Sequence, residues 1–467
     1  MRLTLYNTLT REVEPVVPIN GRKLRFYCCG PTVYGPAHIG NFRTFVMQDV
    51  FRRVLEVIGQ PCMHVRNITD VDDKTIRQSV ELDLPLTEVT AHWTARFHAD
   101  CAALNLRSPH IEPSAVAHLP EQIALIEKLI AKGHAYRSED GSVYFKVASF
   151  PAYGALSRLK ERSITTGAVD REDSDEYERD SAADFVLWKA RRPEDGPNYW
   201  PSPFGEGRPG WHVECSAMSM RHLGESFDLH SGGVDLIFPH HENEIAQSEA
   251  ATGRPFVRHW FHIAHLLVHG GKMSKSLGNL YTLDDVRDQG HRPEELRYVL
   301  LSGGYRQQLN FTWESLGAAR KALARLRELQ KRLGGPSELV GAPKERDFAP
   351  FRPVIGALLE DLNTPEALGR LFATVKTLNQ KLDAGALDPL AIKAAREGLA
   401  AVLDALGLEL PAATSESVPE PVQKLAAERW QAKQQRDWAT ADALREQLHA
   451  AGWATKDEQS DYQLLPL

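Results

Sequence analysis

A buried strand, a glycine-rich loop and a long amphipathic helix follow one another near the start of this chain. Apolar residues at 23–29 predict the strand, and glycines and prolines interrupt the chain between residues 30 and 36. Apolar residues then recur with helical spacing over residues 38–58, and Gly59 ends the pattern. In nucleotide-binding folds such a unit places phosphate groups at the start of the helix. The order therefore predicts an α/β fold with a parallel sheet, and residues 63–68 are expected to form its next strand.

The composition is that of a folded globular protein. Hydrophobic residues make up 42% and charged residues 25% of the 467 residues, so extensive disorder is not expected, and the length favours several domains. The formal net charge of -7 argues against a protein that coats nucleic acid without selectivity. The first residues lack the apolar core of a signal peptide, and no apolar run is long enough to span a membrane. We therefore expect a cytoplasmic protein without membrane contacts.

The sequence pattern divides the chain into several segments. Between residues 115 and 205 a helical stretch at 121–132, a β-like stretch at 142–147 and an acidic run at 170–184 predict an inserted module. Because like charges repel, the acidic run is expected to be a solvated loop. Leucines spaced by three or four residues over 316–333 predict a bundle helix, whose basic residues face either solvent or RNA. A linker rich in proline, serine and glutamate follows near residue 411, and the predicted boundaries are 1–114, 115–205, 206–290, 291–315, 316–410 and 420–467.

Two separate motifs carry groups suited to bind the phosphates of ATP. Lys272 and Lys275 lie three residues apart after two glycines, and His38 and Asn41 lie at the predicted start of the first helix. Displacing pyrophosphate from a nucleotide builds negative charge on several oxygens, and fixed donors aimed at those oxygens lower the barrier. Gly40 would let the adenosine approach the helix backbone closely. Together the two motifs predict an ATP site.

A metal site is the second candidate. If a helix begins near residue 239, His240 and Glu244 project from one face of it, since they are four residues apart. Cys215 and one thiol of the pair Cys28 and Cys29 would complete a ligand set suited to zinc; the two thiols of that pair face opposite sides of a strand. The alternative is that the helix residues are merely polar and exposed. Five scattered cysteines do not suggest a disulfide framework.

Six short blocks together resemble class I aminoacyl-tRNA synthetases, and within that class the cysteinyl-tRNA synthetase family. Their order and spacing are similar to that family over nearly the whole chain. The resemblance implies a split Rossmann-type catalytic domain with an inserted connective domain, then a stem-contact region, an α-helical bundle and a small anticodon-binding domain, at the boundaries given above. The blocks are residues 27–34, 38–41, 66–70, 210–216, 240–244 and 272–276.

The resemblance also implies roles for particular residues. One zinc ion per chain would be held by Cys29, Cys215, His240 and Glu244, with Cys29 chosen because it directly precedes Gly30. Asn41 departs from the histidine that is usual in the class, so most cationic stabilisation would come from the other catalytic positions. The implied site residues are His38, Asn41, Lys272 and Lys275 for catalysis, His38, Gly40 and Lys275 for ATP, and Thr69 and Trp211 for the substrate.

The implied reaction is the ATP-dependent activation of L-cysteine, with Mg²⁺ on the phosphates, and transfer of the cysteinyl group to cysteine tRNA by a monomer. For tRNA the terminal domain offers Lys433, Arg436, Trp438 and Asp442, because basic residues beside tryptophans suit stacking on unpaired bases. Trp430 and Trp453 fit either base contact or a structural role. Three alternatives remain: a related ligase that joins cysteine to an amino sugar, a noncatalytic RNA-binding relative, and a zinc hydrolase.

Overall fold

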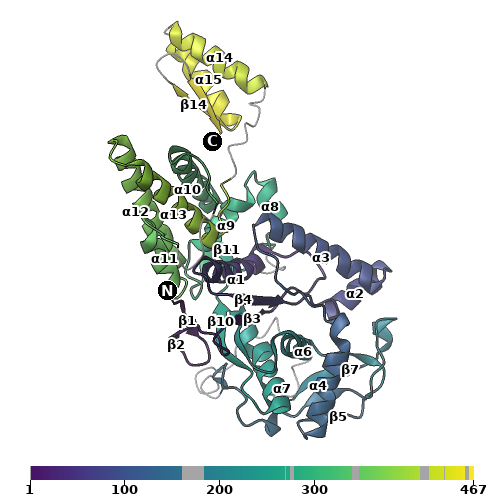
Figure 1. Ribbon diagram of the computed structural model, residues 1–467. Coiled ribbons are helices and arrows are strands. Elements are labelled where there is room, and N and C mark those ends of the chain that lie inside the picture. The colour runs from purple at the N-terminus through teal and green to yellow at the C-terminus, as the bar shows by residue number, and fades with distance from the viewer. Residues whose placement is uncertain are drawn as a thin grey trace. The chain divides into compact units, whose positions relative to one another are not determined.

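The computed structural model describes residues 2–159, 184–268, 270–273, 278–338, 346–410, 420–435, 437–457 and 462–466. The chain divides into two compact units, Met1–Glu409 and Leu410–Leu467 (Figure 1). Each unit has a hydrophobic core of its own. Within the described ranges, no helix has the length and apolar character needed to cross a membrane.

The centre of the first unit is a four-stranded sheet in which every neighbouring pair is parallel. Its strand order is β10-β9-β3-β4, formed by Val257–Ile263, Phe227–Gly233, Leu24–Cys28 and Cys62–Arg66. Two of these strands precede the inserted segment and two follow it. The predicted first strand, its parallel neighbour and the split α/β fold are therefore confirmed.

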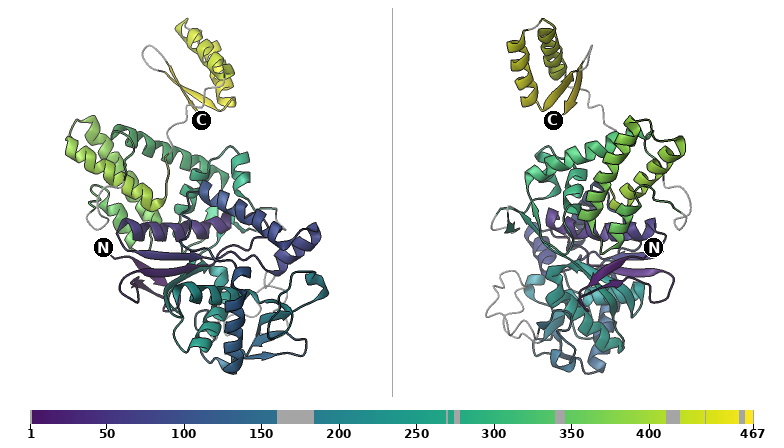
Figure 2. Two further views of the ribbon diagram at one scale, coloured as in Figure 1. Left: turned by 45° about the vertical axis from the view of Figure 1, so that its right-hand side comes forward. Right: turned by 90° about the vertical axis from the view of Figure 1, so that its left-hand side faces the viewer.

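Helices cover both faces of this sheet, as Figure 2 shows. On one face α1 (Ile39–Val57) packs against β4, β9 and β10. On the other face α6 (Trp211–Leu223) packs against β3 and β4, and α7 (Glu242–Thr252) packs against α6. The helix predicted at 38–58 matches α1 closely, since His38 is its N-cap and Ile58 its C-cap.

The strand order reverses between β3 and β9. From β3 the chain passes through α1 to β4 on one side, and from β9 it passes through α7 to β10 on the other side. The Cys29 N–H donates to the Ser231 carbonyl at 3.1 Å, so the carboxyl ends of the two strands lie side by side. Open α/β sheets bind their ligands at such a reversal point. The topology therefore directs attention to the residues just after β3 and β9.

The inserted segment forms a module of one helix and an antiparallel sheet. The helix is α4 (Leu119–Ala131), and the sheet order β5-β6-β7-β8 is formed by Ala135–Arg137, Val143–Phe145, Phe185–Ala190 and Gly207–Pro209. The predicted helix and β-like stretch are thus confirmed. Its core is shared with Val213 on α6 and Ala246 on α7. The acidic run lies outside the described residues except for Asp184, which accepts hydrogen bonds from the Tyr136 hydroxyl and the Val147 N–H.

A helical bundle follows, formed by α9 (Pro293–Leu301), α10 (Trp313–Arg332), α11 (Arg352–Leu359), α12 (Thr364–Asp383) and α13 (Pro389–Leu406). The spaced leucines predicted for α10 are buried. Several of its basic side chains contact other parts of the protein: Arg320 pairs with Glu295 at 2.7 Å, Arg332 pairs with Asp383, and Arg325 lies 4.9 Å from the ring centroid of Phe372. Part of this basic face therefore serves the fold.

Shorter elements complete the first unit. They are the hairpin of β1 (Thr4–Asn7) and β2 (Glu12–Pro15), helices α2 (Asp73–Leu82), α3 (Leu86–Ala103) and α8 (Leu283–Asp288), and a small sheet of order β12-β11-β13 formed by Gly271–Lys272, Leu266–Val268 and Leu309–Phe311.

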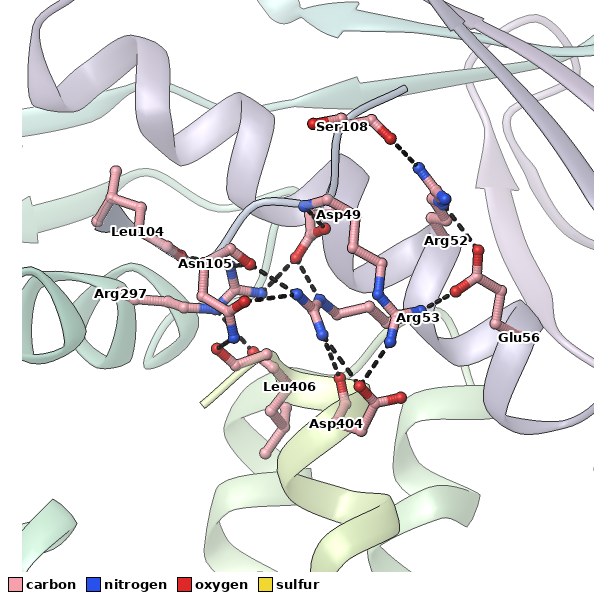
Figure 3. A network of polar contacts seen from close by, with 12 residues as sticks. Asp49, Arg52, Arg53, Glu56, Leu104, Asn105, Ser108, Arg297, Asp404 and Leu406 are labelled. Atoms are coloured by element: carbon pink, nitrogen blue, oxygen red, sulfur yellow. Dashed lines mark hydrogen bonds and ion pairs between the residues drawn. The ribbon is translucent and has the colours of Figure 1, made fainter. Parts of the chain in front are cut away.

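A buried network of charges joins α1 to the bundle (Figure 3). The Asp49 carboxylate on α1 accepts hydrogen bonds from Arg53 Nε and Arg297 Nη2, both at 2.6 Å. Arg297 also donates to the Leu406 carbonyl at 2.9 Å, and Arg53 donates to the Asp404 carboxylate at 3.1 Å. Two cations and two anions are thereby paired, and α1 is tied to α9 and to the C-terminal end of α13. We name this network the α1–α13 joint.

The second unit is a small domain of two helices and a hairpin. Its elements are α14 (Glu420–Gln434), α15 (Trp438–Ala450), β14 (Trp453–Asp457) and β15 (Tyr462–Pro466). Trp453 belongs to its core, and the Trp430 ring lies 5.7 Å from the Tyr462 ring. These two tryptophans therefore have a structural role, whereas Trp438 is 58% exposed.

Candidate functional site

The four candidate metal ligands converge at the reversal point of the sheet. Cys29 follows β3, Cys215 lies on α6, and His240 and Glu244 lie at the start of α7. One ligand atom from each falls in a group whose members lie within 4.8 Å of one another, and all four residues are buried. Of the adjacent thiols, Cys29 belongs to this group, and among the described residues Cys28 belongs to no such group.

The distances within this group fit a four-coordinate metal. The Cys29 and Cys215 sulfurs are 3.9 Å apart, and Glu244 Oε1 lies 3.9 Å from Cys29 Sγ and 3.1 Å from His240 Nε2. A tetrahedral zinc ion with bonds of about 2.0 to 2.3 Å holds its ligand atoms roughly 3.3 to 3.8 Å apart. The pre-formed spacing and the two sulfurs therefore suit zinc.

The start of α7 is close to the prediction. Phe238 is extended, and the chain is helical from Pro239 through the wide turn that ends at His241 and into α7 at Glu242. The side chains of His240 and Glu244 meet at a separation of 3.1 Å, as expected for residues four apart on one helical face.

Hydrogen bonds within the ligand group shift the pKa values of three of its members. A hydrogen bond with Cys29 lowers the pKa of Cys215 to about 6 although burial opposes it. Burial would lower the pKa of His240, but hydrogen bonds to Cys215 and Glu244 raise it to about 10. Burial would raise the pKa of Glu244, but His230 and His240 lower it to about 2. Cys215 and Glu244 thus supply negative charge to the site, and a metal ion that binds there has to displace the proton of His240.

Further histidines, which the sequence did not predict, surround the ligand group. His230 Nε2 lies 2.9 Å from Glu244 Oε2, and His212 Nδ1 lies 3.0 Å from His240 Nδ1. Such hydrogen bonds hold metal ligands in a fixed orientation. The only signal in the sequence was the doublet at 240–241, because His212 and His230 reach the site from α6 and β9.

His241 takes part in a second possible ligand set. Its Nε2 lies 3.3 Å from Cys29 Sγ, and its Nδ1 lies 2.7 Å from His262 Nε2. Cys29, His230, His241 and Glu244 also fall within 4.8 Å of one another. Because the two sets share Cys29 and Glu244, they describe one site for a single ion. The set with two sulfurs suits zinc better, since thiolates are its preferred soft ligands.

The predicted ATP motif forms the N-terminus of α1. His38 is the N-cap: its Nδ1 accepts a hydrogen bond from the Asn41 N–H at 3.2 Å, and its own N–H donates to Asn41 Oδ1 at 3.0 Å. Asn41 Oδ1 therefore caps the helix, and the amide Nδ2 remains as its donor. Since Nδ1 of His38 accepts, a neutral imidazole carries its proton on Nε2.

Burial affects the charge of His38. It lowers the pKa of His38 below its usual value of 6.5, although Asp235 opposes this shift. The shift favours the neutral ring, which can still donate a hydrogen bond from Nε2.

The second ATP motif lies against the first. A Cβ atom on Gly40 would lie 2.9 Å from His38 Nδ1 and 3.2 Å from the Met273 sulfur, so Met273 contacts this turn. The Ile39 N–H also donates to the Tyr281 carbonyl at 2.8 Å, beyond the lysine motif. The backbone of Lys272 belongs to β12, and Lys275 lies outside the described residues. The structure thus brings Met273, in the described start of the lysine motif, against the turn at His38 and Gly40.

The predicted substrate residues lie beside the ligand group. The Trp211 ring is 4.3 Å from the His240 ring, and Trp211 is partly exposed rather than a core residue. Thr69 is 2% exposed, and its hydroxyl accepts a hydrogen bond from Asn67 Nδ2 at 3.0 Å. Asn67 Oδ1 in turn accepts from the Gly30 N–H at 2.9 Å. Asn67, which the sequence did not single out, links Thr69 to the loop after β3.

Three of the predicted tRNA residues lie on the helices of the second unit: Lys433 is in the last turn of α14, and Trp438 and Asp442 belong to α15. Lys433 Nζ lies 5.8 Å from the ring centroid of Trp430, and Asp442 pairs with Arg445 at 3.1 Å. Trp438 begins α15 and is exposed. Arg436 lies outside the described residues.

Comparisons with known proteins agree with this architecture. Residues 15–321 match the family described as tRNA synthetases class I (C) catalytic domain, and residues 353–411 match the DALR domain. The methionyl-tRNA synthetase of Mycobacterium tuberculosis, solved with methionyl-adenylate, has a similar fold: the TM-score is 0.59 at 16% identity, over 90% of this chain and 96% of that one. The fold and the site therefore define a class I aminoacyl-tRNA synthetase.

Full-length relatives narrow the class. The chain is 54% identical to the cysteine–tRNA ligase of Opitutus terrae, over 100% of this chain and 99% of the relative. It is 46% identical to that of Chlamydia pneumoniae, over 100% and 98% of the two chains. The chain belongs to the cysteine–tRNA ligase family, whose enzymes attach cysteine to tRNA. The matches extend through the second unit. A ligase that joins cysteine to an amino sugar would have no use for an anticodon-binding domain, and neither would a zinc hydrolase.

Proposed function

We propose that this enzyme activates L-cysteine with ATP to form cysteinyl-adenylate, and then transfers the cysteinyl group to the terminal adenosine of cysteine tRNA. The observation that carries the proposal is the contact of Met273 with the His38–Gly40 turn, close to the reversal point where the sulfur ligands lie. This arrangement would put the side chains that bind phosphate and those that bind sulfur, through the metal, at one edge of the sheet.

In the first step the substrate carboxylate attacks the α-phosphorus of ATP, and pyrophosphate leaves. The attacking group is already anionic, so the protein needs no nucleophile and acts by positioning and charge stabilisation. His38 Nε2–H, Asn41 Nδ2, Lys272 and Lys275 would donate to the phosphate oxygens, with Mg²⁺ bound to ATP. Gly40, which lacks a side chain, would let the adenosine approach the helix backbone closely.

Cys29, Cys215, His240 and Glu244 would hold one zinc ion. When bound, the zinc would accept a substrate thiolate in addition to its four protein ligands, whereas the hydroxyl of serine is a much poorer ligand. Trp211 would form a wall of this pocket, and Thr69 would assist binding. A site that depends on one such contact can discriminate by roughly 10⁴ to 10⁵, so no editing site is required.

In the second step a ribose hydroxyl of the terminal adenosine, the 2′ hydroxyl by class resemblance, attacks the carbonyl of the adenylate, and AMP leaves. The second unit would bind the anticodon through Lys433, Arg436, Trp438 and Asp442. Exposed Trp438 offers a stacking surface, and nearby lysine and arginine side chains offer charge. We propose that the enzyme acts as a monomer.

Amino-acid-dependent exchange of labelled pyrophosphate into ATP tests the first step. We expect exchange with cysteine and at most a trace with serine. In the variant Cys215→Ser both bound zinc and cysteine-dependent exchange should be lost. Cys62→Ser is a matched control, because Cys62 is also buried but lies on β4 outside the ligand group. Absence of exchange with any amino acid would refute the activation step, and full activity of a zinc-free variant would refute the role of the metal.

A further inference from the structure

Tyr27 is a buried residue of β3 that no step above uses. It is 0% exposed and lies two residues before Cys29, on the same side of the strand. Both residues belong to one buried cluster together with Cys215. The ring of Tyr27 lies 5.1 Å from that of His230, in an edge-on arrangement at 64°. Tyr27 thus borders the ligand group from the sheet side.

The Tyr27 hydroxyl has no hydrogen-bond partner of acceptable geometry, although its surroundings are fully buried. A buried polar group without a partner lowers stability, and a phenylalanine would fill the same space without that cost. The Tyr27 hydroxyl therefore requires a role other than packing.

A sulfur of the ligand group is the candidate partner. Cys29 and Cys215 share the buried cluster with Tyr27, and Cys29 Sγ already lies 3.3 Å from His241 Nε2, which leaves the Cys215 sulfur. A tyrosine hydroxyl keeps its proton at neutral pH, so it gains by donating a hydrogen bond to an acceptor. A thiol sulfur is a weak acceptor, but a thiolate sulfur is a much stronger one.

We propose that Tyr27 is a positioning residue of the metal site, whose hydroxyl donates a hydrogen bond to the Cys215 sulfur when that sulfur is a metal-bound thiolate. This inference rests on the proposed zinc site. The hydrogen bond fixes the direction of the Cys215 side chain and draws charge from its sulfur. His230, His212 and His241 contact the other three ligands at 2.9 to 3.3 Å, so Tyr27 completes the set of supporting partners.

The variant Tyr27→Phe separates this role from simple packing, because it keeps the ring and removes only the hydroxyl. Zinc affinity of the full-length protein is measured by competition with a chromogenic chelator. We expect about a 10-fold weaker affinity, the lower end of the range for loss of a supporting hydrogen bond. The control is Tyr298→Phe, which removes the hydroxyl of a partly buried tyrosine on α9 that packs against Phe372, away from the ligand group.

The cobalt-substituted protein gives a second readout. Loss of a hydrogen bond to sulfur raises the energy of the thiolate electrons, so the sulfur-to-cobalt charge-transfer band should move to longer wavelength in Tyr27→Phe and stay in place in Tyr298→Phe. Unchanged zinc affinity together with an unchanged band in Tyr27→Phe would overturn the proposal while leaving the zinc site intact. A wild-type protein that binds no zinc would overturn both.

Discussion

At the scale of single residues, close contacts define the site more than flexible side chains do. Gly30 shows this most clearly: a Cβ atom there would lie 1.6 Å from the Asn67 carbonyl oxygen. The same glycine donates its N–H to the Asn67 side chain. Only glycine permits this approach, and it fixes the loop between Cys29 and Thr69.

His64 leads to a prediction about pH. It is fully buried on β4, stacks on Phe26, and neither ring nitrogen has a hydrogen-bond partner. Burial, followed by the charges of Arg66, Arg52 and His110, holds the pKa of His64 well below its usual value. The His64 ring therefore takes up a proton near pH 6.5 in the unfolded chain but stays neutral in the folded chain. As a result, the folded state is not penalised by His64 above pH 6.5 and loses stability as the pH falls below that value.

Replacing His64 by phenylalanine should remove this contribution to the pH dependence. Urea unfolding at pH 8 and pH 5.5 should show that His64→Phe loses less stability on acidification than the wild type does, by about 1 kcal/mol. The exposed His92 provides the control, since His92→Gln should leave the pH dependence unchanged. An identical loss in His64→Phe and wild type would show that this ring is not the proton-sensitive group.

At the scale of elements, α1 combines a structural cap with a chemical role. The helix could be predicted from sequence because its apolar periodicity and Gly59 are local signals. The positions of His212 and His230 beside the ligands could not be predicted from sequence, since distant segments meet there only through the order of the parallel strands. The helical start near Pro239 could be predicted as well, because a proline favours an extended residue before it and suits the first turn of a helix. Local sequence signals therefore predict the helices and strands, whereas the completed site depends on packing between segments that are distant in the sequence.

Substitutions of Asn41 can separate its two roles. Asn41→Asp keeps the capping oxygen and suits the positive end of the helix dipole, but it removes the donor and adds negative charge beside the phosphates. Thermal stability should be retained, and pyrophosphate exchange should fall at least tenfold.

Asn41→Ala removes the cap as well, and it should cost about 1 kcal/mol of stability in addition to activity. If Asn41→Asp keeps full exchange activity, Asn41 acts only as a cap.

At the scale of the whole molecule, the α1–α13 joint links the helix of the ATP motif to the bundle. Burial alone would raise the pKa of Asp49, but Arg297 and Arg53 hold it below its usual value, so the carboxylate stays ionised. Arg297 and Arg53 are 0% and 3% exposed, and a change at Asp49 would leave both cations buried without their shared partner.

The variant Asp49→Asn should therefore be strongly destabilised, by about 3 to 5 kcal/mol, because it breaks a buried ion pair from one side. The comparison is Glu366→Gln, whose pair with Arg370 is half exposed and should contribute at most about 1 kcal/mol. Urea unfolding of both variants measures the difference. Equal, small effects would mean that water or a local shift compensates the two arginines.

The division into two units gives a further prediction. A protein ending at residue 409 keeps the sheet, the ligand group and the joint, but it lacks the second unit with its exposed Trp438. It should retain cysteine-dependent pyrophosphate exchange within about twofold and lose most of its charging of cysteine tRNA. Charging at the full rate would show that the second unit does not contribute to tRNA binding.

The pleat of β3 has a consequence for the neighbouring cysteines. Successive residues of a strand face opposite sides, so Cys28 and Cys29 have identical chemistry but entirely different surroundings. A lineage that lost Cys29 could not recruit its neighbour, because shifting the strand by one position would also carry Gly30 away from Asn67. The doublet thus looks like a spare copy in the sequence and provides no redundancy in the folded protein.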